Sequence, residues 1–183
     1  MKTLRVYFIT ALALVLISAC NEGKNPTSPE ATTTPAGGSL AKGSGPSSAG
    51  QGKIAGTDRV FAFNATTHPN GTVSGVGTLN RTSSGTRFKF SIDCLSVDGN
   101  VATMTGTVTE SNAYPTSVGS PCWFRVKDNG EGANASPDEM TFWVFCDTPE
   151  GCNIPVCDVV DPDFELEYGA FYPIAAGNIQ VKP

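Results

Sequence analysis

An acidic loop in the C-terminal half of the chain has the residue types that a hard cation binds. Asp128, Asn129, Glu131 and Asp138 offer side-chain oxygens, and the glycines among them permit tight bends. Ca²⁺ takes about six to eight such oxygens, so these four residues are candidate calcium ligands, although their spacing is not that of an EF-hand. The alternative is a solvated acidic turn in which Asp128 and Asn129 bond to backbone amides.

The two segments that flank this loop align as a hairpin. Pairing Asp128 with Met140 sets apolar residues opposite apolar residues and places Cys122 opposite Cys146. A slip of one residue would destroy these matches, because side chains alternate between the two faces of a strand. An exported protein meets an oxidising compartment, so this register predicts a Cys122–Cys146 disulfide.

The remaining cysteines allow one more disulfide. Cys152 and Cys157 bracket a short loop that contains proline and are expected to pair, which leaves Cys94 as a buried free thiol. A zinc site made from Cys146, Cys152 and Cys157 is an alternative, but it lacks the usual closely spaced cysteine doublets. A nucleophilic Cys94 would need a base, and His68 is the single histidine of the chain.

Aromatic residues in the same hairpin suggest a ligand surface. Trp123, Trp143 and Phe145 fall on one side of it and would form a carbohydrate-binding platform if that side faces solvent. If the strands are instead covered on both faces, these residues belong to the core. A glycan-hydrolysing enzyme would need two carboxylates, and no motif selects a pair. Enzymatic activity is therefore uncertain, and a non-enzymatic role is favoured.

Alternation of apolar and polar residues runs through the chain after residue 52 and is typical of half-buried strands. The segments with this pattern are separated by turns rich in Gly, Asn, Asp and Ser. They predict an all-β domain over residues 53–183, a compact antiparallel β-sandwich of about eight strands, with a small β-barrel as the alternative. The expected strands are Val60–Ala65, Thr72–Leu79, Arg87–Cys94, Val101–Thr109, Pro121–Asp128, Glu139–Cys146, Phe164–Tyr168 and Asn178–Lys182.

The N-terminal residues 1–19 have the features of a bacterial lipoprotein signal peptide. Two cations precede an apolar run that is too short to span a membrane, and the run ends in Ile17-Ser-Ala-Cys20, which resembles the lipobox. We expect cleavage before Cys20 and acylation of its thiol with palmitate-type chains. Asn21 follows in place of Asp, which favours the outer membrane. Residues 20–52 are rich in Gly, Pro, Ser and Thr and predict a disordered tether.

Several sequence phrases of the domain are distinctive when taken together. They are Phe61-Ala-Phe63 with Gly71–Leu79, Cys94–Asn100, Val126–Gly132 with Pro137-Asp138, and Gly177–Val181. Through these phrases residues 56–183 resemble secreted bacterial β-domains of unassigned function that are called post-COAP-1 domains. The resemblance implies a compact exported β-domain and brings no catalytic residues. The chain departs from the family in its extra cysteines and in the acidic segment 146–168.

Together these patterns indicate a lipid-anchored, non-enzymatic binding or structural module of the bacterial cell envelope. Its expected partners are the membrane, through the N-terminal lipid, and an unidentified envelope or extracellular ligand. Twelve Lys and Arg against 17 Asp and Glu give a net charge of −5, which argues against nucleic acid as a partner. Ca²⁺ would stabilise the domain if the acidic loop binds it. The alternative function is a carbohydrate-binding or carboxylate-dependent glycan-hydrolysing domain.

Overall fold

The computed structural model describes residues 45–132 and 134–183, and within them the chain forms nine strands and two short helices. The predicted signal peptide, the predicted lipidation site Cys20 and most of the predicted tether lie outside the described residues. In the described part, no helix has the length and apolarity needed to cross a membrane. The elements are β1 (Ser47–Ile54), β2 (Arg59–Thr67), β3 (Val73–Arg81), β4 (Thr86–Asp98), β5 (Val101–Ser111), η1 (Pro115–Ser117), β6 (Pro121–Lys127), β7 (Glu139–Met140), β8 (Val144–Phe145), α1 (Pro162–Tyr168) and β9 (Tyr172–Lys182).

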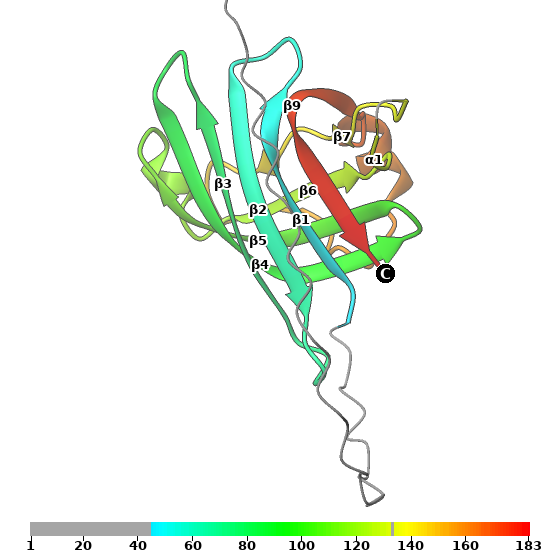
Figure 1. Ribbon diagram of the computed structural model, residues 1–183. Coiled ribbons are helices and arrows are strands. Elements are labelled where there is room, and N and C mark those ends of the chain that lie inside the picture. The colour runs from blue at the N-terminus through cyan, green and yellow to red at the C-terminus, as the bar shows by residue number, and fades with distance from the viewer. Residues whose placement is uncertain (1–44, 133) are drawn as a thin grey trace, which may run out of the picture. The chain divides into compact units, whose positions relative to one another are not determined.

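The strands close into an antiparallel barrel (Figure 1). Their order is β5-β4-β3-β2-β1-β9-β7-β6, and β5 pairs with β6 to complete the ring, while β8 adds to β6. All-β architecture is confirmed. The barrel alternative fits this ring better than the two-sheet sandwich that the sequence favoured, because the sheet returns to its first strand. Closure removes the free edges that a sheet would otherwise expose.

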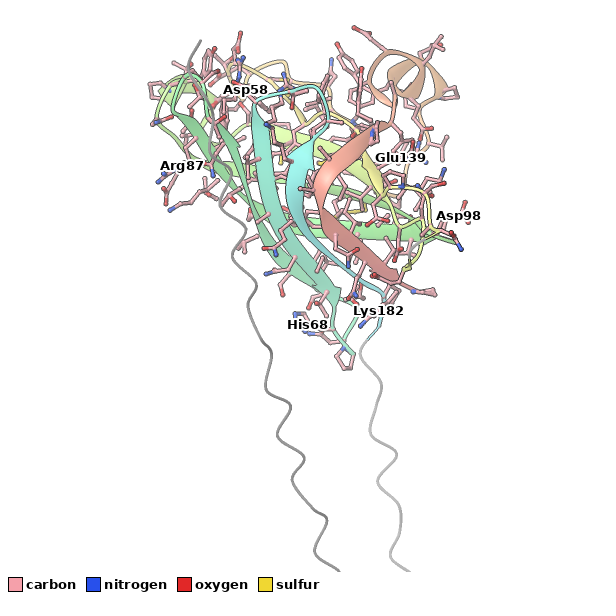
Figure 2. The ribbon with its side chains drawn as sticks, turned by 45° about the horizontal axis from the view of Figure 1, so that its top comes forward. Asp58, His68, Arg87, Asp98, Glu139 and Lys182 are labelled. Atoms are coloured by element: carbon pink, nitrogen blue, oxygen red, sulfur yellow. A yellow bond between two sulfur atoms is a disulfide. The ribbon has the colours of Figure 1, made fainter. Side chains whose placement is uncertain are left out.

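The barrel interior is filled by large apolar side chains from alternate positions of the strands. In β4, Phe88, Phe90 and Ile92 are buried, as the alternation predicts. The Phe124 ring of β6 contacts the Phe63 and Phe90 rings edge-to-face, with centroids 5.4 and 5.7 Å apart. An eight-stranded barrel is just wide enough for side chains to fill, or to leave room for one small ligand. Asp58 lies at one end of this barrel and His68 at the other (Figure 2).

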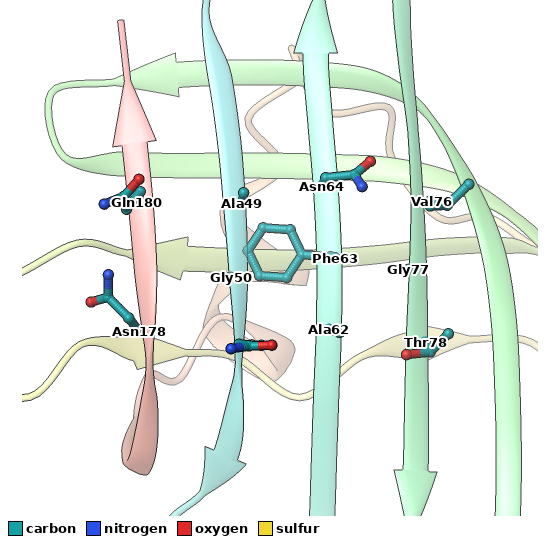
Figure 3. Close-up of a pocket in the computed structure, with 11 residues that line it drawn as sticks. Ala49, Gly50, Ala62, Phe63, Asn64, Val76, Gly77, Thr78, Asn178 and Gln180 are labelled. Atoms are coloured by element: carbon teal, nitrogen blue, oxygen red, sulfur yellow. The ribbon is translucent and has the colours of Figure 1, made fainter.

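Strand β1 is missing from the sequence-based prediction, which placed this segment in the tether. The domain therefore begins by residue 45 rather than at residue 53. β1 has few apolar side chains because its inward positions lie under aromatic rings from β2. A Cβ added to Gly50 would lie 2.8 Å from Cε1 of Phe63, whose ring extends toward β1 (Figure 3). Glycine makes room for the ring, and its lack of a side chain hides the strand pattern.

The segment Phe164–Tyr168, predicted as a strand, is part of helix α1. Asp161 caps this helix, since its Oδ1 accepts hydrogen bonds from the backbone N–H groups of Asp163 and Phe164. Pro162 occupies the first turn, where its missing N–H costs nothing. Asp161-Pro162 is a helix-start signal that was present in the sequence. The alternation of apolar and acidic residues in the short segment after it imitates a strand and concealed this signal.

The hairpin register predicted across the acidic loop is wrong. Met140 of β7 pairs with Val126 instead of Asp128, and Phe145 of β8 pairs with Cys122. The predicted continuous strand is broken between β7 and β8. The break lets Trp143 pack into the barrel core, where its ring lies edge-on to the Phe90 ring. Burial of Trp143 in the core therefore takes the place of continuous strand pairing between β7 and β8.

The structure has two disulfides, as the cysteine count suggested, but the predicted pairs are wrong. Cys94 bonds to Cys157 and Cys146 bonds to Cys152, while Cys122 is a buried free thiol. A register shift after Ile92 explains the role of Cys94. The shift moves Cys94 off the inward-facing row, and the next inward residues of β4, Leu95 and Val97, pack against the core.

We expect Cys122 to resist alkylation in the folded protein. Burial, and secondarily the charge of Asp93, raises the pKa of the Cys122 thiol to about 12, so almost no thiolate exists at pH 8. Iodoacetamide should leave this residue unmodified in native, unreduced protein and modify it after unfolding in guanidinium, as peptide mass mapping can show. Rapid native labelling of Cys122, or a mapped Cys122–Cys146 peptide, would contradict this.

Candidate functional site

A cavity of about 570 Å³ opens at the barrel end that carries the β1–β2 and β3–β4 turns. Cavities of this size hold small molecules, and the mouths of β-barrels are common ligand sites. The lining combines aromatic rings with a few polar groups. The lining residues are Arg59, Leu79, Arg81, Thr86, Phe88, Tyr114, Phe142, Trp143, Val144, Phe145, Asp147 and Tyr168.

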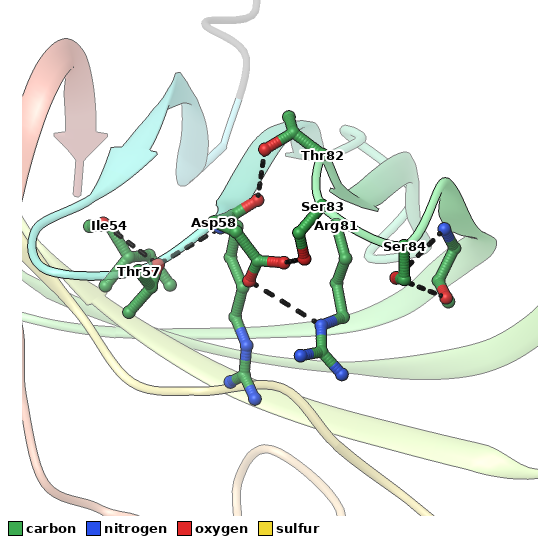
Figure 4. A network of polar contacts seen from close by, with 9 residues as sticks. Ile54, Thr57, Asp58, Arg81, Thr82, Ser83 and Ser84 are labelled. Atoms are coloured by element: carbon green, nitrogen blue, oxygen red, sulfur yellow. Dashed lines mark hydrogen bonds and ion pairs between the residues drawn. The ribbon is translucent and has the colours of Figure 1, made fainter.

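A polar network holds the two turns at this end together (Figure 4). The carboxylate of Asp58 accepts a hydrogen bond from the Ser83 hydroxyl and lies 3.6 Å from Nε of Arg81. The backbone carbonyl of Asp58 also accepts the N–H of Thr82 at 2.9 Å. The Ser83 hydrogen bond, and more weakly the charge of Arg81, lowers the pKa of Asp58. The network thus positions Arg81 with its charge already paired.

Arg59 is held differently. Its Cζ lies 4.0 Å above the centroid of the Phe142 ring, and this ring stacks on Tyr172 with centroids 4.3 Å apart. Partial burial, with the like charge of Arg81 as the second cause, lowers the pKa of Arg59. Within the described residues, none of the ion pairs includes Arg59, and its guanidinium has no hydrogen-bond acceptor. A fixed cation with free donors therefore faces the cavity.

Aromatic rings form the cavity walls. The Phe88 and Tyr114 rings stack with centroids 5.9 Å apart, and Phe145 lies 4.5 Å from Phe88. Trp143 is only 9% exposed and packs against Phe90 at 4.1 Å. Its Nε1 is buried and has no hydrogen-bond acceptor among the described residues. An unpaired buried donor is uncommon in folded proteins and calls for an explanation.

The structure divides the predicted aromatic platform. Trp123 points outward from β6, but Phe164 of α1 covers it, with ring centroids 5.2 Å apart. Trp143 and Phe145 lie instead on the cavity. The three residues therefore do not share one solvent-exposed face, and Trp123 fits the alternative in which both faces of its strand are covered.

The buried carboxylate of the acidic loop, Asp138, bonds to backbone amides. Its Oδ1 accepts the N–H of Asn129 at 2.9 Å and its Oδ2 accepts the N–H of Ile179 at 2.8 Å. β9 pairs with β7 only through Tyr172 and Pro173, so the later residues of this edge have no partner strand in the described chain. The carboxylate of Asp138 accepts a backbone hydrogen bond from β9 that a partner strand would otherwise accept.

The other predicted calcium ligands follow the same pattern. Asp128 accepts the N–H of Val181 at 3.0 Å, and Glu131 accepts the side-chain amide of Asn178 at 2.9 Å. Asn129 donates its side-chain N–H to the carbonyl of Pro137. Among the described residues, no group of three or more His, Cys, Asp or Glu has the geometry to hold a metal ion. The loop closes the seam between β6 and β9, and calcium binding stays a prediction to be measured.

The reactive-cysteine alternatives do not fit. Cys94, Cys146, Cys152 and Cys157 are all in disulfides, so they supply neither a nucleophile nor a zinc site. His68 lies at the barrel end opposite the cavity, with its Nε2 2.6 Å from the Ser74 hydroxyl (Figure 2).

A second hollow of about 500 Å³ lies on the outer face of β9, β1, β2 and β3 (Figure 3). The register places Gln180, Ala49, Asn64 and Val76 in one row across these strands. The small Ala49 side chain leaves space between the amides of Gln180 and Asn64. This hollow is more open than the aromatic cavity, and its lining combines amides with small apolar residues.

Comparison with protein-family models, curated proteins and solved structures finds no match for this chain. The family resemblance noted in the sequence therefore stays a prediction. Sequence reasoning did not single out Arg59, Arg81, Phe88 or Tyr114 as site residues. They come from three strands and a loop, and no local motif joins them. The one available signal was the pair of arginines next to turns at Arg59 and Arg81.

Proposed function

We propose that this protein is a lipid-anchored, non-enzymatic binding module of the cell envelope and that the aromatic cavity at the barrel end is its ligand site. The observation that supports this most strongly is the cavity itself, in which aromatic walls lie beside Arg59, whose guanidinium has no ion-pair partner among the described residues. Among the residues that line it, Asp147 is the one carboxylate. A glycan-hydrolysing mechanism with two carboxylates has no support at this site.

The test is binding of a neutral aromatic probe, phenyl-naphthylamine, whose fluorescence rises when it leaves water. We expect saturable binding and energy transfer from the nearby Trp143. Val144→Phe should reduce the affinity because it narrows the cavity, whereas Val76→Phe, an enlargement on the exposed outer face, should not. Absence of saturable binding, or an equal effect of the two variants, would contradict the proposed site.

The proposed anchor rests on the Ile17-Ser-Ala-Cys20 sequence. Labelled palmitate should enter the wild-type protein and should not enter Cys20→Ser, because the thiol is the acylated group. The variant should also leave the membrane fraction, since a multiply acylated cysteine is a stable anchor and an unmodified chain is not. Equal labelling of the two proteins would exclude acylation at this cysteine.

A carbohydrate-binding function is the second candidate, and the outer hollow supports it better than the predicted aromatic platform. The side-chain amides of Gln51, Asn64 and Gln180, which have no hydrogen-bond partner in the described part of the chain, surround small alanines on an open face. Binding to a glycan array that is lost in an Asn64→Ala, Gln180→Ala double variant, and kept in Val144→Phe, would favour this candidate.

A further inference from the structure

We infer that the barrel-end cavity selects small molecules that carry an anionic group, such as a carboxylate, sulfonate or phosphate, on a flat apolar body, and that Arg59 binds the anion. This inference rests on the proposed function, because it names the ligand class of the same cavity.

Arg59 is oriented before any ligand arrives. Its guanidinium lies over the Phe142 ring, with Cζ 4.0 Å from the ring centroid, and Phe142 is itself held by stacking on Tyr172. A side chain fixed in this way loses little further entropy when it binds a partner. The planar guanidinium offers parallel N–H groups that match the two oxygens of a carboxylate or a sulfonate.

Of the two arginines in the lining, Arg59 is the one without an ion-pair partner among the described residues. Arg81, the other arginine of the lining, is within ion-pair distance of Asp58, and Asp58 is also bonded to Ser83. Asp147 lines the cavity but is exposed and is not within ion-pair distance of Arg59. Asp58 acts on Arg59 from beyond ion-pair distance, so an entering anion would meet a positive charge that is only partly compensated. The site is partly water-excluded, and Coulomb attraction there is stronger than in bulk water.

The apolar part of the ligand is indicated by the walls. Phe88, Tyr114 and Phe145 form a continuous aromatic cluster on the cavity. Rings of this kind pack best against flat apolar or aromatic surfaces. A free inorganic anion would leave these walls in contact with water.

The experiment compares two probes that differ by one sulfonate group, anionic anilinonaphthalene sulfonate and neutral phenyl-naphthylamine. The wild-type protein should bind the sulfonate at least about tenfold more tightly. Arg59→Gln should remove most of this preference and change the affinity for the neutral probe by less than about twofold. Arg59→Lys should keep part of the preference, because it retains the charge and loses the planar donors. Arg87→Gln, the same change at an exposed arginine outside the lining, should have no effect.

The outcomes separate the two proposals. Binding of both probes with equal affinity in the wild-type protein would overturn the anion inference and leave the proposed function in place. Binding of neither probe would remove the proposed function itself. If inorganic phosphate displaces the sulfonate probe as effectively as naphthoate does, the apolar body contributes nothing and the inference is wrong. Unchanged melting of Arg59→Gln, together with retained binding of the neutral probe, shows that the variant is folded.

Discussion

Asp138→Ala is expected to lower the free energy of unfolding by about 3–5 kcal/mol. The substitution removes both acceptors of a buried carboxylate and leaves the N–H groups of Asn129 and Ile179 without partners. Hydrogen bonds to a charged group contribute about 1.5–3 kcal/mol each, and a buried amide without an acceptor retains its desolvation cost. Because these bonds replace a strand along β9, their loss should loosen the seam of the barrel.

Urea denaturation, followed by circular dichroism, measures this effect. Asp158→Ala is the matched control, because Asp158 belongs to the same acidic stretch and is exposed, without a hydrogen-bond or ion-pair partner in the described residues. A destabilisation by Asp138→Ala no larger than that of the control would show that the carboxylate does not hold the seam.

Thermal melting tests the predicted calcium site in the same loop. A rise in melting temperature at millimolar Ca²⁺ in the wild type, absent in Glu131→Gln, would support the predicted ion site.

Removing the Cys94–Cys157 disulfide is expected to destabilise the protein by about 4 kcal/mol. This disulfide spans 63 residues, so it constrains a large part of the unfolded chain. The Cys146–Cys152 disulfide spans 6 residues, and its loss should cost about 2 kcal/mol in the same chain-entropy account.

The measurement uses two double variants, Cys94→Ser with Cys157→Ser and Cys146→Ser with Cys152→Ser, so that neither leaves an unpaired partner free to exchange. Cys122 is buried and is not expected to substitute for either lost partner. Loss of the longer disulfide should also weaken probe binding, because it frees the segment that follows the cavity residue Phe145. Equal stability of the two double variants would contradict the predicted order.

Much of the strand pattern was accessible from the sequence. Period-two alternation placed the strands between Arg59 and Lys127 to within a few residues, and the pattern of β4 correctly identified Phe88, Phe90 and Ile92 as inward-facing. The turn residues were equally informative. Gly85 and Gly99 have φ values of 69° and 58°, which a glycine adopts without strain, and each closes a predicted turn. These features depend on near neighbours along the chain, so local patterns reveal them.

Other features were decided by contacts between distant residues. β1 is a strand because Gly50 fits beneath the Phe63 ring, a fact invisible in a glycine-rich stretch. The disulfide pairing follows from a β-bulge before Cys94, and the hairpin register gave way so that Trp143 could enter the core. In each case the winning interaction joins residues that are far apart in sequence.

The candidate site belongs to this second group. The sequence by itself determined an all-β domain with an acidic loop, alternating strands and cysteines suited to disulfides. Only closure of the barrel brought Arg59 of β2, Phe88 of β4 and Trp143 to one cavity. Closure depends on β5 pairing with β6 and on β9 pairing with β1, and the energy of those pairings is summed over whole strands. No single residue or short motif encodes it, and so the cavity could be found only in the tertiary structure.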